Sequence, residues 1–279
     1  MHSDILYHYT DFTALDGILA DAELRLNNVL NMNDASEMNL FMSGLCKNIT
    51  DTFLKEKNPE KARLTWLIFM KEQKDRFSYS SYAACFSRYR DDAAQWERYG
   101  NAGRGICIAF EEDLLSKMTA GALSMQSVLY QDRISAHPLA DELHDLIAES
   151  AVSDVSSVPA PLRTALNRAW EVSAIYKHPS FSSENEVRLL ISPFGNDYFD
   201  VRPQYHISRD RIKKYYPLDL KKMCEKAGVS MEELIPELII GPESTQSLPI
   251  LQDYLVSFGL SVLAEHVSYS KCPLRRSSL

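Results

Sequence analysis

The spacing of hydrophobic positions along the chain changes repeatedly between a strand-like and a helix-like pattern. Stretches of branched and aromatic residues that predict short strands lie at 5–9, 24–26, 80–87, 105–110, 186–191, 237–241 and 261–267. Apolar positions three or four residues apart, which form one face of a helix, lie at 12–19, 38–53, 59–76, 91–99, 138–150, 161–176, from 219 onward and at 245–258. The strands are short and do not alternate regularly with helices, so the pattern indicates an α+β fold.

The predicted strand at 186–191 has the clearest alternation. Val187, Leu189 and Ile191 share one face, and Glu186 and Arg188 share the other, because successive side chains of a strand point to opposite faces. One interpretation is an ion pair on a solvated strand face, which would stabilise the protein by only about 0–1 kcal/mol. The other is a site carboxylate that aligns a ribose hydroxyl or stabilises a cation.

Composition and charge narrow the class of protein. The chain has 279 residues, of which 45% are hydrophobic and 24% charged, which is typical of a globular protein of one large or two small domains. Its net charge of −8 argues against a globally basic nucleic-acid-binding surface. Short basic runs at 209–214 and 275–276 are interpreted first as solvated surface. A Ser/Pro-rich stretch at 153–159 is the best candidate for a flexible connector.

The cysteines and the longest apolar runs indicate the compartment. Five scattered cysteines occur without a Cys-x-x-Cys motif, a pattern typical of a reducing compartment and not of a zinc site. No apolar run approaches the roughly 20 residues of a membrane helix, and the first residues lack a leader pattern. We therefore expect a cytoplasmic protein without a membrane partner. Metal-ligand spacings and a Gly-x-Ser-x-Gly elbow are also absent, so we expect no metal site.

The first predicted strand carries the first candidate site residues, in the order Tyr7-His8-Tyr9-Thr10. His8 and Thr10 are two residues apart and are expected to point to the same face. A histidine beside a hydroxyl can hold the polar edge of a ligand. The structural alternative is that Thr10 caps the following helix and His8 is an ordinary strand residue, and taken alone this motif favours that alternative.

A polar turn at 31–37 precedes the second predicted helix. Asp34 and Glu37 have the spacing of a capping box, which would explain both without a function. The capping box leaves Asn33 unexplained. Helix N-termini also bind anions such as pyrophosphate, so Asn33 and Asp34 are candidate ligand-binding residues, although an acidic cap would weaken that use.

Two further motifs follow at 85–87 and 95–99. Ser87 ends a predicted strand, which is a usual place for site residues. Trp96 and Tyr99 are three residues apart on a predicted helix and share a face. Core packing is the simpler interpretation of such an aromatic pair, and an aromatic wall beside a flat ligand is the functional one.

Taken in order, these motifs resemble the bacterial family catalogued as domain of unknown function 2971. The resemblance covers about residues 5–275 and is weak at 50–76 and 112–170, which look like variable insertions. It departs from the family pattern at Gln95, where methionine is expected. The residues that carry it are Leu6 to Thr10, Asn33-Asp34 with Glu37, Cys85-Phe86-Ser87, Trp96 with Tyr99, Gly103 to Phe110, Glu184 to Arg188, Ile239-Ile240-Gly241-Pro242 and Ser270 to Arg275.

The order of motifs also resembles, more loosely, the ADP-ribosyltransferase fold of DNA-modifying toxins and RNA 2′-phosphotransferases. That resemblance implies a single catalytic domain over 1–279, with a split mixed β-sheet core and helical insertions near 38–76 and 112–177. It implies that NAD is a substrate, with Glu186 as the catalytic carboxylate, and Glu184 is the alternative carboxylate. It further implies that His8, Tyr9 and Thr10 hold NAD and that Ser87 or Tyr99 lies beside the nicotinamide. Tyr99 would also take part in catalysis. The other binding residues it implies are Asn33, Asp34, Ser87, Trp96 and Arg188.

The function that follows is an NAD-dependent ADP-ribosyltransferase, a transferase of the glycosyltransferase class. Its acceptor would be nucleic acid or protein, and its biological setting a toxin or phage-defence effector with an antitoxin or defence-system partner. Such chemistry needs a fixed anion near a developing positive charge and needs no serine nucleophile or metal. Two alternatives stay open: a metal-independent nucleic-acid-processing enzyme that uses His8, and a non-catalytic ligand-sensing or interaction module.

Overall fold

The computed structural model describes residues 4–32, 37–75, 81–120, 123–131, 134, 137–150, 158–191, 202–208 and 211–273. Within these ranges it is a mixed α/β structure with a ten-stranded mixed sheet. The strands of this sheet are β1 (Ile5–Thr10), β2 (Glu23–Asn28), β3 (Tyr82–Ser87), β4 (Ile106–Glu111), β5 (Ser124–Ser127), β8 (Glu186–Ile191), β9 (Gln204–Ser208), β10 (Arg211–Asp219), β11 (Glu237–Ile240) and β12 (Val267–Tyr269). Two short strands, β6 (Leu129–Tyr130) and β7 (Tyr176–Lys177), pair in parallel beside it.

The sheet divides beside β3. One edge of β3 pairs with β8 over its whole length, from Tyr82 to Ser87. The other edge pairs with β2 only at Tyr82 and Ala83, and with β1 only at Ser87. Residues 84–86 on that edge therefore have no ladder partner in β1 or β2, because the two strands diverge there. On one side of this divergence the strand order is β12-β11-β4-β1, and on the other side it is β2-β10-β9.

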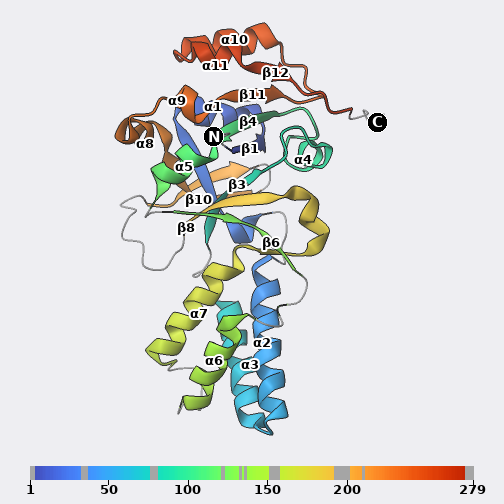
Figure 1. Ribbon diagram of the computed structural model, residues 1–279, viewed down its shortest axis with the longest axis vertical. Helices are drawn as coiled ribbons and strands as arrows, with labels where there is room; N and C mark the ends of the chain where they lie inside the picture. The colour runs from blue at the N-terminus through green and yellow to red at the C-terminus, as the bar shows by residue number, and fades with distance from the viewer. Residues whose placement is uncertain are drawn as a thin grey trace.

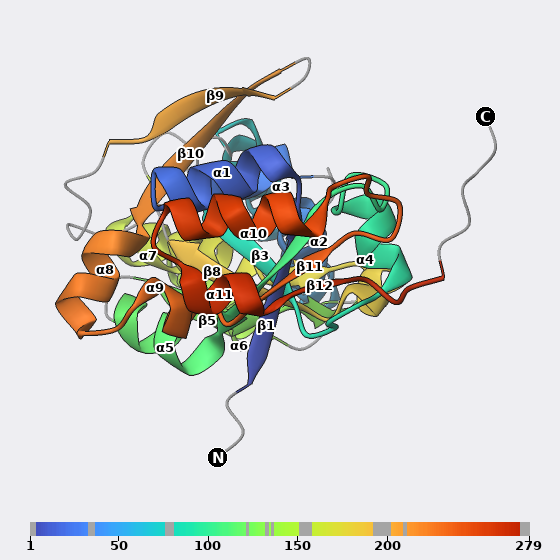
Figure 2. The same ribbon diagram turned by 90° about the horizontal axis from the view of Figure 1, so that it is seen from above.

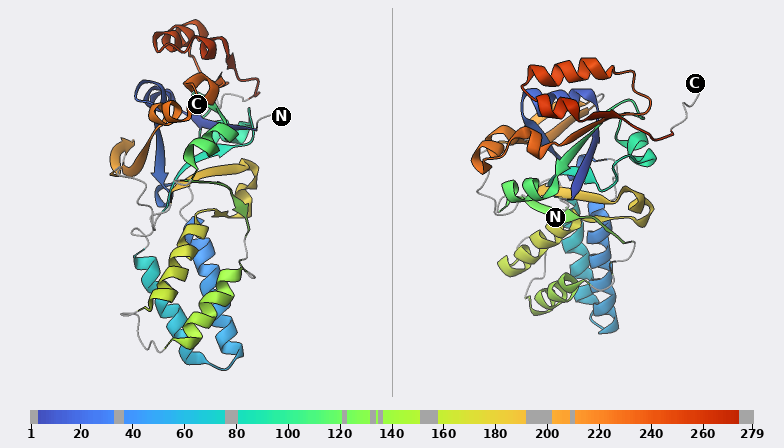
Figure 3. Two further views of the ribbon diagram at one scale, coloured as in Figure 1. Left: turned by 60° about the vertical axis from the view of Figure 1, so that its left-hand side comes forward. Right: turned by 45° about the horizontal axis from the view of Figure 1, so that its top comes forward.

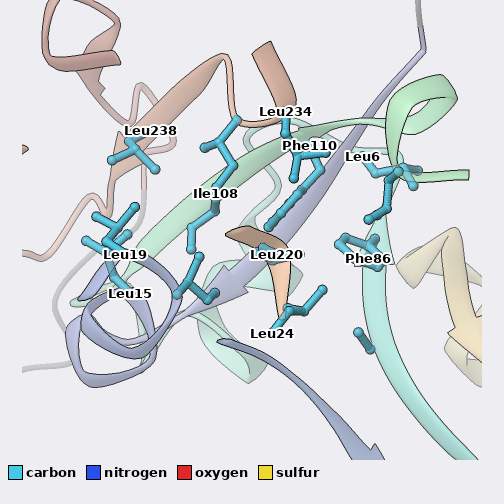
Figure 4. Close-up of a cluster of buried hydrophobic side chains, with 14 of the residues drawn as sticks. Leu6, Leu15, Leu19, Leu24, Phe86, Ile108, Phe110, Leu220, Leu234 and Leu238 are labelled. Carbon is cyan, nitrogen blue, oxygen red and sulfur yellow. The ribbon is translucent and has the colours of Figure 1, made fainter. Parts of the chain in front are cut away.

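One face of the sheet is covered by the main hydrophobic core. Leu6 of β1 and Ile108 and Phe110 of β4 point into the same apolar space as Leu15 of α1 (Phe12–Ala20) (Figure 4). The other helices that cover this face are α5 (Glu112–Thr119), α8 (Leu220–Ala227), α9 (Met231–Leu234), α10 (Leu248–Ser257) and α11 (Ser261–Glu265). Figure 2 shows α1 and α10 side by side, where the Tyr254 hydroxyl donates a hydrogen bond to Asp16.

A second hydrophobic core belongs to four long helices that project from the sheet (Figure 1). They are α2 (Glu37–Lys55), α3 (Pro59–Lys74), α6 (Pro138–Glu149) and α7 (Ala160–Ser173). Figure 3 shows them as one elongated bundle, although α2–α3 and α6–α7 are far apart in the sequence. This core also includes Ala83 of β3 and Leu190 of β8, so the bundle is anchored to the sheet.

Most of the predicted elements are confirmed, and the differences have physical causes. Residues 261–265 form a helix, not the predicted strand, because the Glu232 carboxylate accepts hydrogen bonds from the N–H groups of Val262 and Leu263 at 2.7 and 3.2 Å. The polar edge strand β5 and the β9–β10 hairpin were not predicted, because their side chains do not show the hydrophobic alternation that indicates a strand. Most of the connector at 153–159 lies outside the described residues. Asn33, Asp34 and the basic pair at 275–276 also lie outside them.

Two glycines lie where the chain crosses itself behind β4 and β11. The N–H of Gly241 donates to the carbonyl of Gly105 at 2.9 Å. A Cβ atom on Gly241 would lie 2.3 Å from the carbonyl oxygen of Gly103, and one on Gly105 would lie 2.0 Å from that of Thr10. These contacts are closer than van der Waals radii allow, so only glycine fits here.

We expect Gly241→Ala to lower the free energy of unfolding by about 1–3 kcal/mol, because the added methyl group forces the two backbones apart. Gly17→Ala is the matched control, since its Cβ would meet the nearest atom at 3.8 Å and alanine favours a helix by up to about 1 kcal/mol. Denaturant titrations measure both changes. Equal effects of the two substitutions would show that the crossing tolerates a side chain.

Candidate functional site

A cavity of about 190 Å³ lies where β1 and β2 diverge beside β3. Its walls come from β1, β2, β3, β8 and β10, from α4 (Ala93–Arg98) with its C-cap Tyr99, from Lys177 of β7, and from Glu184 at the end of the short 3-10 helix η3 (Pro179–Glu184). The cavity therefore collects side chains from segments that are far apart in the sequence. Of the predicted site residues, it is lined by His8, Tyr9, Ser87, Tyr99, Glu184, Glu186 and Arg188.

His8 is held at the divergence by the free edge of β3. Its Nδ1 atom lies 2.8 Å from the carbonyl oxygen of Cys85. A carbonyl only accepts, so the tautomer is assigned with the proton on Nδ1 and an unprotonated Nε2. Burial lowers the pKa of His8, and the Cys85 hydrogen bond opposes this only in part, so the ring is neutral at pH 7. The Nε2 atom has no hydrogen-bond partner among the described residues and is an available acceptor.

Ser87 connects the two halves of the site through the sheet. It pairs with Tyr7 on β1 and with Glu186 on β8, so these three residues lie in one row. The Ser87 hydroxyl donates to the backbone carbonyl of Glu184 at 2.8 Å and accepts from the N–H of Tyr89 at 3.1 Å. Its hydrogen bonds are thus made within the protein, and its position fixes the turn that carries Glu184.

Two buried carboxylates share one buried lysine. The Lys177 ammonium donates to Glu184 Oε2 at 2.6 Å and to Glu186 Oε2 at 3.1 Å. Glu184 Oε1 also accepts from the Tyr99 hydroxyl at 2.8 Å and from Arg98 Nη1 at 3.0 Å. The left-handed backbone of Asn185, with φ of 42°, places the two carboxylates on this one ammonium group.

Arg188 completes this network from beneath the cavity. Its guanidinium donates to both oxygens of Glu186, at 2.7 and 3.1 Å, and to the carbonyl of Ala174 at 2.6 Å. Arg188 is fully buried, and Glu186 is only 7% exposed. The polar face predicted for this strand is therefore not a solvated face, because the chain after α7 covers it.

The network keeps Glu186 ionised. Burial alone would raise the pKa of Glu186, but the charge of Arg188, its hydrogen bonds and Lys177 together lower that pKa to about 2. The pKa of Tyr99 is raised by burial and by the neighbouring Glu184. At neutral pH the site therefore presents an ionised Glu186 and a protonated Tyr99 phenol.

The stability of the protein should depend on pH through Glu186. Its ordinary pKa of 4.5 falls to about 2 in the folded state, so its contribution is complete above pH 4.5 and is lost as the pH falls toward 2. A shift of this size corresponds to on the order of 3 kcal/mol. In denaturant titrations from about pH 6 to about pH 3, the stability difference between wild type and Glu186→Gln should shrink.

The exposed Glu97 supplies the control for this pH dependence. Glu97→Gln is a surface substitution away from the network and should change the free energy of unfolding by no more than about 0.5 kcal/mol throughout the titration. A stability difference between wild type and Glu186→Gln that stays constant with pH would contradict the ion-paired state of Glu186.

Several other predicted residues lie elsewhere. Trp96 is fully buried, does not line the cavity, and donates from Nε1 to Asp91 at 2.6 Å. Thr10 does not line the cavity either, and Asp11 caps α1 in its place by accepting from the N–H of Ala14. Asn33 and Asp34 lie outside the described residues, as does the side chain of Glu37.

The structure also places at the cavity several residues that were not predicted as site residues. Lys177, Arg98 and Tyr130 complete the polar network, and Arg25 and Lys213 line the cavity from β2 and β10. Lys177 carried a weak signal, because it follows an apolar stretch at the end of a predicted helix. Arg25 carried none, and Lys213 belonged only to the basic run at 209–214 that was interpreted first as solvated surface. The two residues become neighbours only when β2 pairs with β10.

Over the described residues, no group of three or more histidine, cysteine, aspartate or glutamate side chains is placed to hold a metal ion. In the same part of the chain, no helix has the length and apolarity to cross a membrane.

Comparison with known proteins gives one match. Residues 95–189 match the model of a family described as "Protein of unknown function (DUF2971)". The matched segment includes Tyr99, Lys177, Glu184, Glu186 and Arg188, and so most of the buried charge network. The chain matched no curated protein and no solved structure. This match, over about a third of the chain, supports the resemblance to the DUF2971 family that the motifs indicate.

Proposed function

We propose that this chain is an NAD-dependent ADP-ribosyltransferase that modifies nucleic acid or protein. The observation that carries the proposal is the convergence of His8, Tyr99, Glu184 and Glu186 on one cavity. The divergence of β1 and β2 beside β3 supports it as well, because a split mixed sheet is the core expected for this fold.

The cavity suits one end of a dinucleotide. Its volume of about 190 Å³ is below the roughly 300–1,000 Å³ typical of sites that enclose a drug-sized ligand. The nicotinamide and its ribose would therefore be enclosed, and the rest of NAD would lie outside. The rings of Tyr7, Tyr9 and Tyr99 supply flat apolar walls.

The proposed reaction breaks the glycosidic bond between nicotinamide and ribose C1′. Nicotinamide leaves with the bonding electron pair, and a nucleophile on the acceptor forms the new bond at C1′ and loses its proton. Positive charge develops on the ribose during this step, and a fixed anion stabilises it. Glu186 is such an anion at neutral pH, and Glu184 is the alternative. The unprotonated Nε2 of His8 can accept a hydrogen bond from a ribose hydroxyl.

The direct test is nicotinamide release by the purified protein. NAD binding is measured by calorimetry, and release by chromatography, with single-stranded DNA, RNA and cell-extract proteins as separate acceptors. We expect NAD to bind and nicotinamide to appear with one acceptor class. The absence of both binding and release with all three would refute the proposal.

A second candidate, a non-catalytic ligand sensor, is favoured by one observation. Both carboxylates already have cationic partners, with Lys177 between them and Arg188 bidentate to Glu186. Such a network can hold the cavity open without reacting. Nucleotide binding without nicotinamide release would select this candidate, and RNA cleavage without NAD would instead indicate a nuclease.

As a transferase, the protein fits the role of a toxin or phage-defence effector, with an antitoxin or defence-system protein as its partner.

A further inference from the structure

The charges around the cavity differ from those of the whole chain. The chain carries a net charge of −8, yet the cavity is lined by four cationic side chains and two carboxylates. Lys177 and Arg188 are engaged by Glu184 and Glu186. The two remaining cations, Arg25 and Lys213, lie together on the β2–β10 side of the cavity.

Strand register places these cations on one face. In β2, Arg25 and Asn27 are two residues apart, and Asn27 pairs with Tyr215 of β10. In β10, Lys213 and Tyr215 are also two residues apart, so all four side chains point to the same face. The guanidinium of Arg25 lies over the ring of Tyr215, 5.0 Å from its centroid. This stacking holds the guanidinium in place beside the cavity.

The charges of this pair are not fully compensated. Glu23 accepts a hydrogen bond from Nε of Arg25 at 3.0 Å, and the terminal NH₂ groups of Arg25 have no ion pair among the described residues. Lys213 is half-buried and forms no ion pair among the described residues.

This uncompensated positive charge lowers the pKa of a neighbouring histidine, His206. His206 pairs with Lys213 across the β9–β10 hairpin. Burial lowers the pKa of His206, and the charges of Arg25 and Lys213 lower it further, while Glu23 opposes them. An anion bound between the two cations would remove part of this effect.

We propose that Arg25 and Lys213 form a phosphate-binding subsite beside the cavity. A guanidinium binds phosphate through paired N–H donors, and an ammonium adds a point charge. The phosphate could come from a nucleotide whose other end occupies the cavity, or from the backbone of a nucleic acid. The inference rests on the proposed function only in expecting a nucleotide there, since the residues require no more than a phosphate group.

Lys213 and Lys214 provide a matched pair of variants. They are adjacent in β10 and point to opposite faces, and the Lys214 ammonium lies 5.8 Å from the ring centroid of Tyr82, away from the cavity lining. Calorimetry with inorganic pyrophosphate, ADP and NAD should show that Lys213→Gln weakens binding roughly tenfold or more. Lys214→Gln should change it by less than about twofold.

A second measurement does not depend on activity. NMR titration of the His206 ring should show that pyrophosphate raises its pKa in the wild type. Lys213→Gln should raise the same pKa in the absence of any ligand, because a neighbouring positive charge is removed. An unchanged His206 pKa in both experiments would overturn the subsite.

The remaining outcomes separate the two sources and the two proposals. If ADP binding requires Lys213 and a single-stranded oligonucleotide binds weakly, the phosphate belongs to a nucleotide. If the oligonucleotide binds tightly through Lys213 and ADP binds weakly, the phosphate belongs to the backbone of a nucleic acid. Equal losses in Lys213→Gln and Lys214→Gln, or no binding of any probe, would overturn the subsite.

If ADP binding depends on Lys213 but no nicotinamide is released, the subsite stands and the transferase fails. If nicotinamide is released with an unchanged KM in Lys213→Gln, the transferase stands and the subsite fails.

Discussion

Arg188→Met is expected to lower the free energy of unfolding by about 3–5 kcal/mol, because it leaves a buried carboxylate without its main partner. Arg188 is fully buried and makes both a bidentate contact with Glu186 and a hydrogen bond to Ala174. Methionine fills much of the same volume but provides no donor, so Glu186 loses its bidentate partner and keeps Lys177 and the contact with Cys85. Denaturant unfolding followed by circular dichroism measures the change.

Arg168→Met is the matched control, because Arg168 is half-exposed and pairs with Glu142 on the surface of the helix bundle. Its loss should cost no more than about 1 kcal/mol. The double variant Glu186→Gln with Arg188→Met should be less destabilised than the sum of the single variants, since it removes both charges together. Additive effects would show that the two side chains do not act as a pair.

Glu186→Gln is expected to lower the rate of nicotinamide release at least about a hundredfold, if the chain is the proposed transferase. The amide is close to the carboxylate in shape but carries no charge, so it cannot stabilise the positive charge on the ribose. The substitution also disturbs the ion pairs of Lys177 and Arg188. NAD binding and the melting temperature must therefore be measured on the same variant.

His8→Asn tests the same site without disturbing the ion pairs. The asparagine amide can still donate toward Cys85, as Nδ1 of His8 does, but offers no counterpart of Nε2. We expect a loss of about tenfold or more in kcat/KM. His266→Asn, at an exposed histidine on the far end of the sheet, is the control. Wild-type turnover in both Glu186→Gln and His8→Asn would exclude the proposed catalytic roles.

Helical periodicity predicted the four bundle helices, but the way they assemble could not be read from the same pattern. The stripe of Met38, Phe41 and Phe53 shows that α2 buries one face. It does not show that α2 packs against α7, whose residues lie more than a hundred positions later. Strand alternation grouped neighbouring side chains correctly but did not show whether they are buried. It placed Glu186 and Arg188 together correctly, yet it could not show that the chain after α7 buries both.

The candidate site was predictable where a motif carried several of its residues and not where pairing of distant strands created it. His8, Ser87, Tyr99 and Glu186 belong to short motifs and all line the cavity. Lys177 belongs to no motif and Lys213 only to a short basic run, and the register of β7 and β10 places them there. Trp96 shows that a motif can also mislead, because its ring packs against Tyr9 in a small core with Cys107 and Ile239.

The helix bundle has a consequence for the synthesis of the protein. Its first helix pair ends at Lys74 and its second begins at Pro138, and ribosomes add about 5–20 residues per second. The early pair therefore leaves the ribosome several seconds before the late pair that completes its core. Throughout that interval the part of the apolar stripe of α2 that packs against α6 and α7 is exposed, which makes the growing chain a target for holding chaperones until α7 is synthesised.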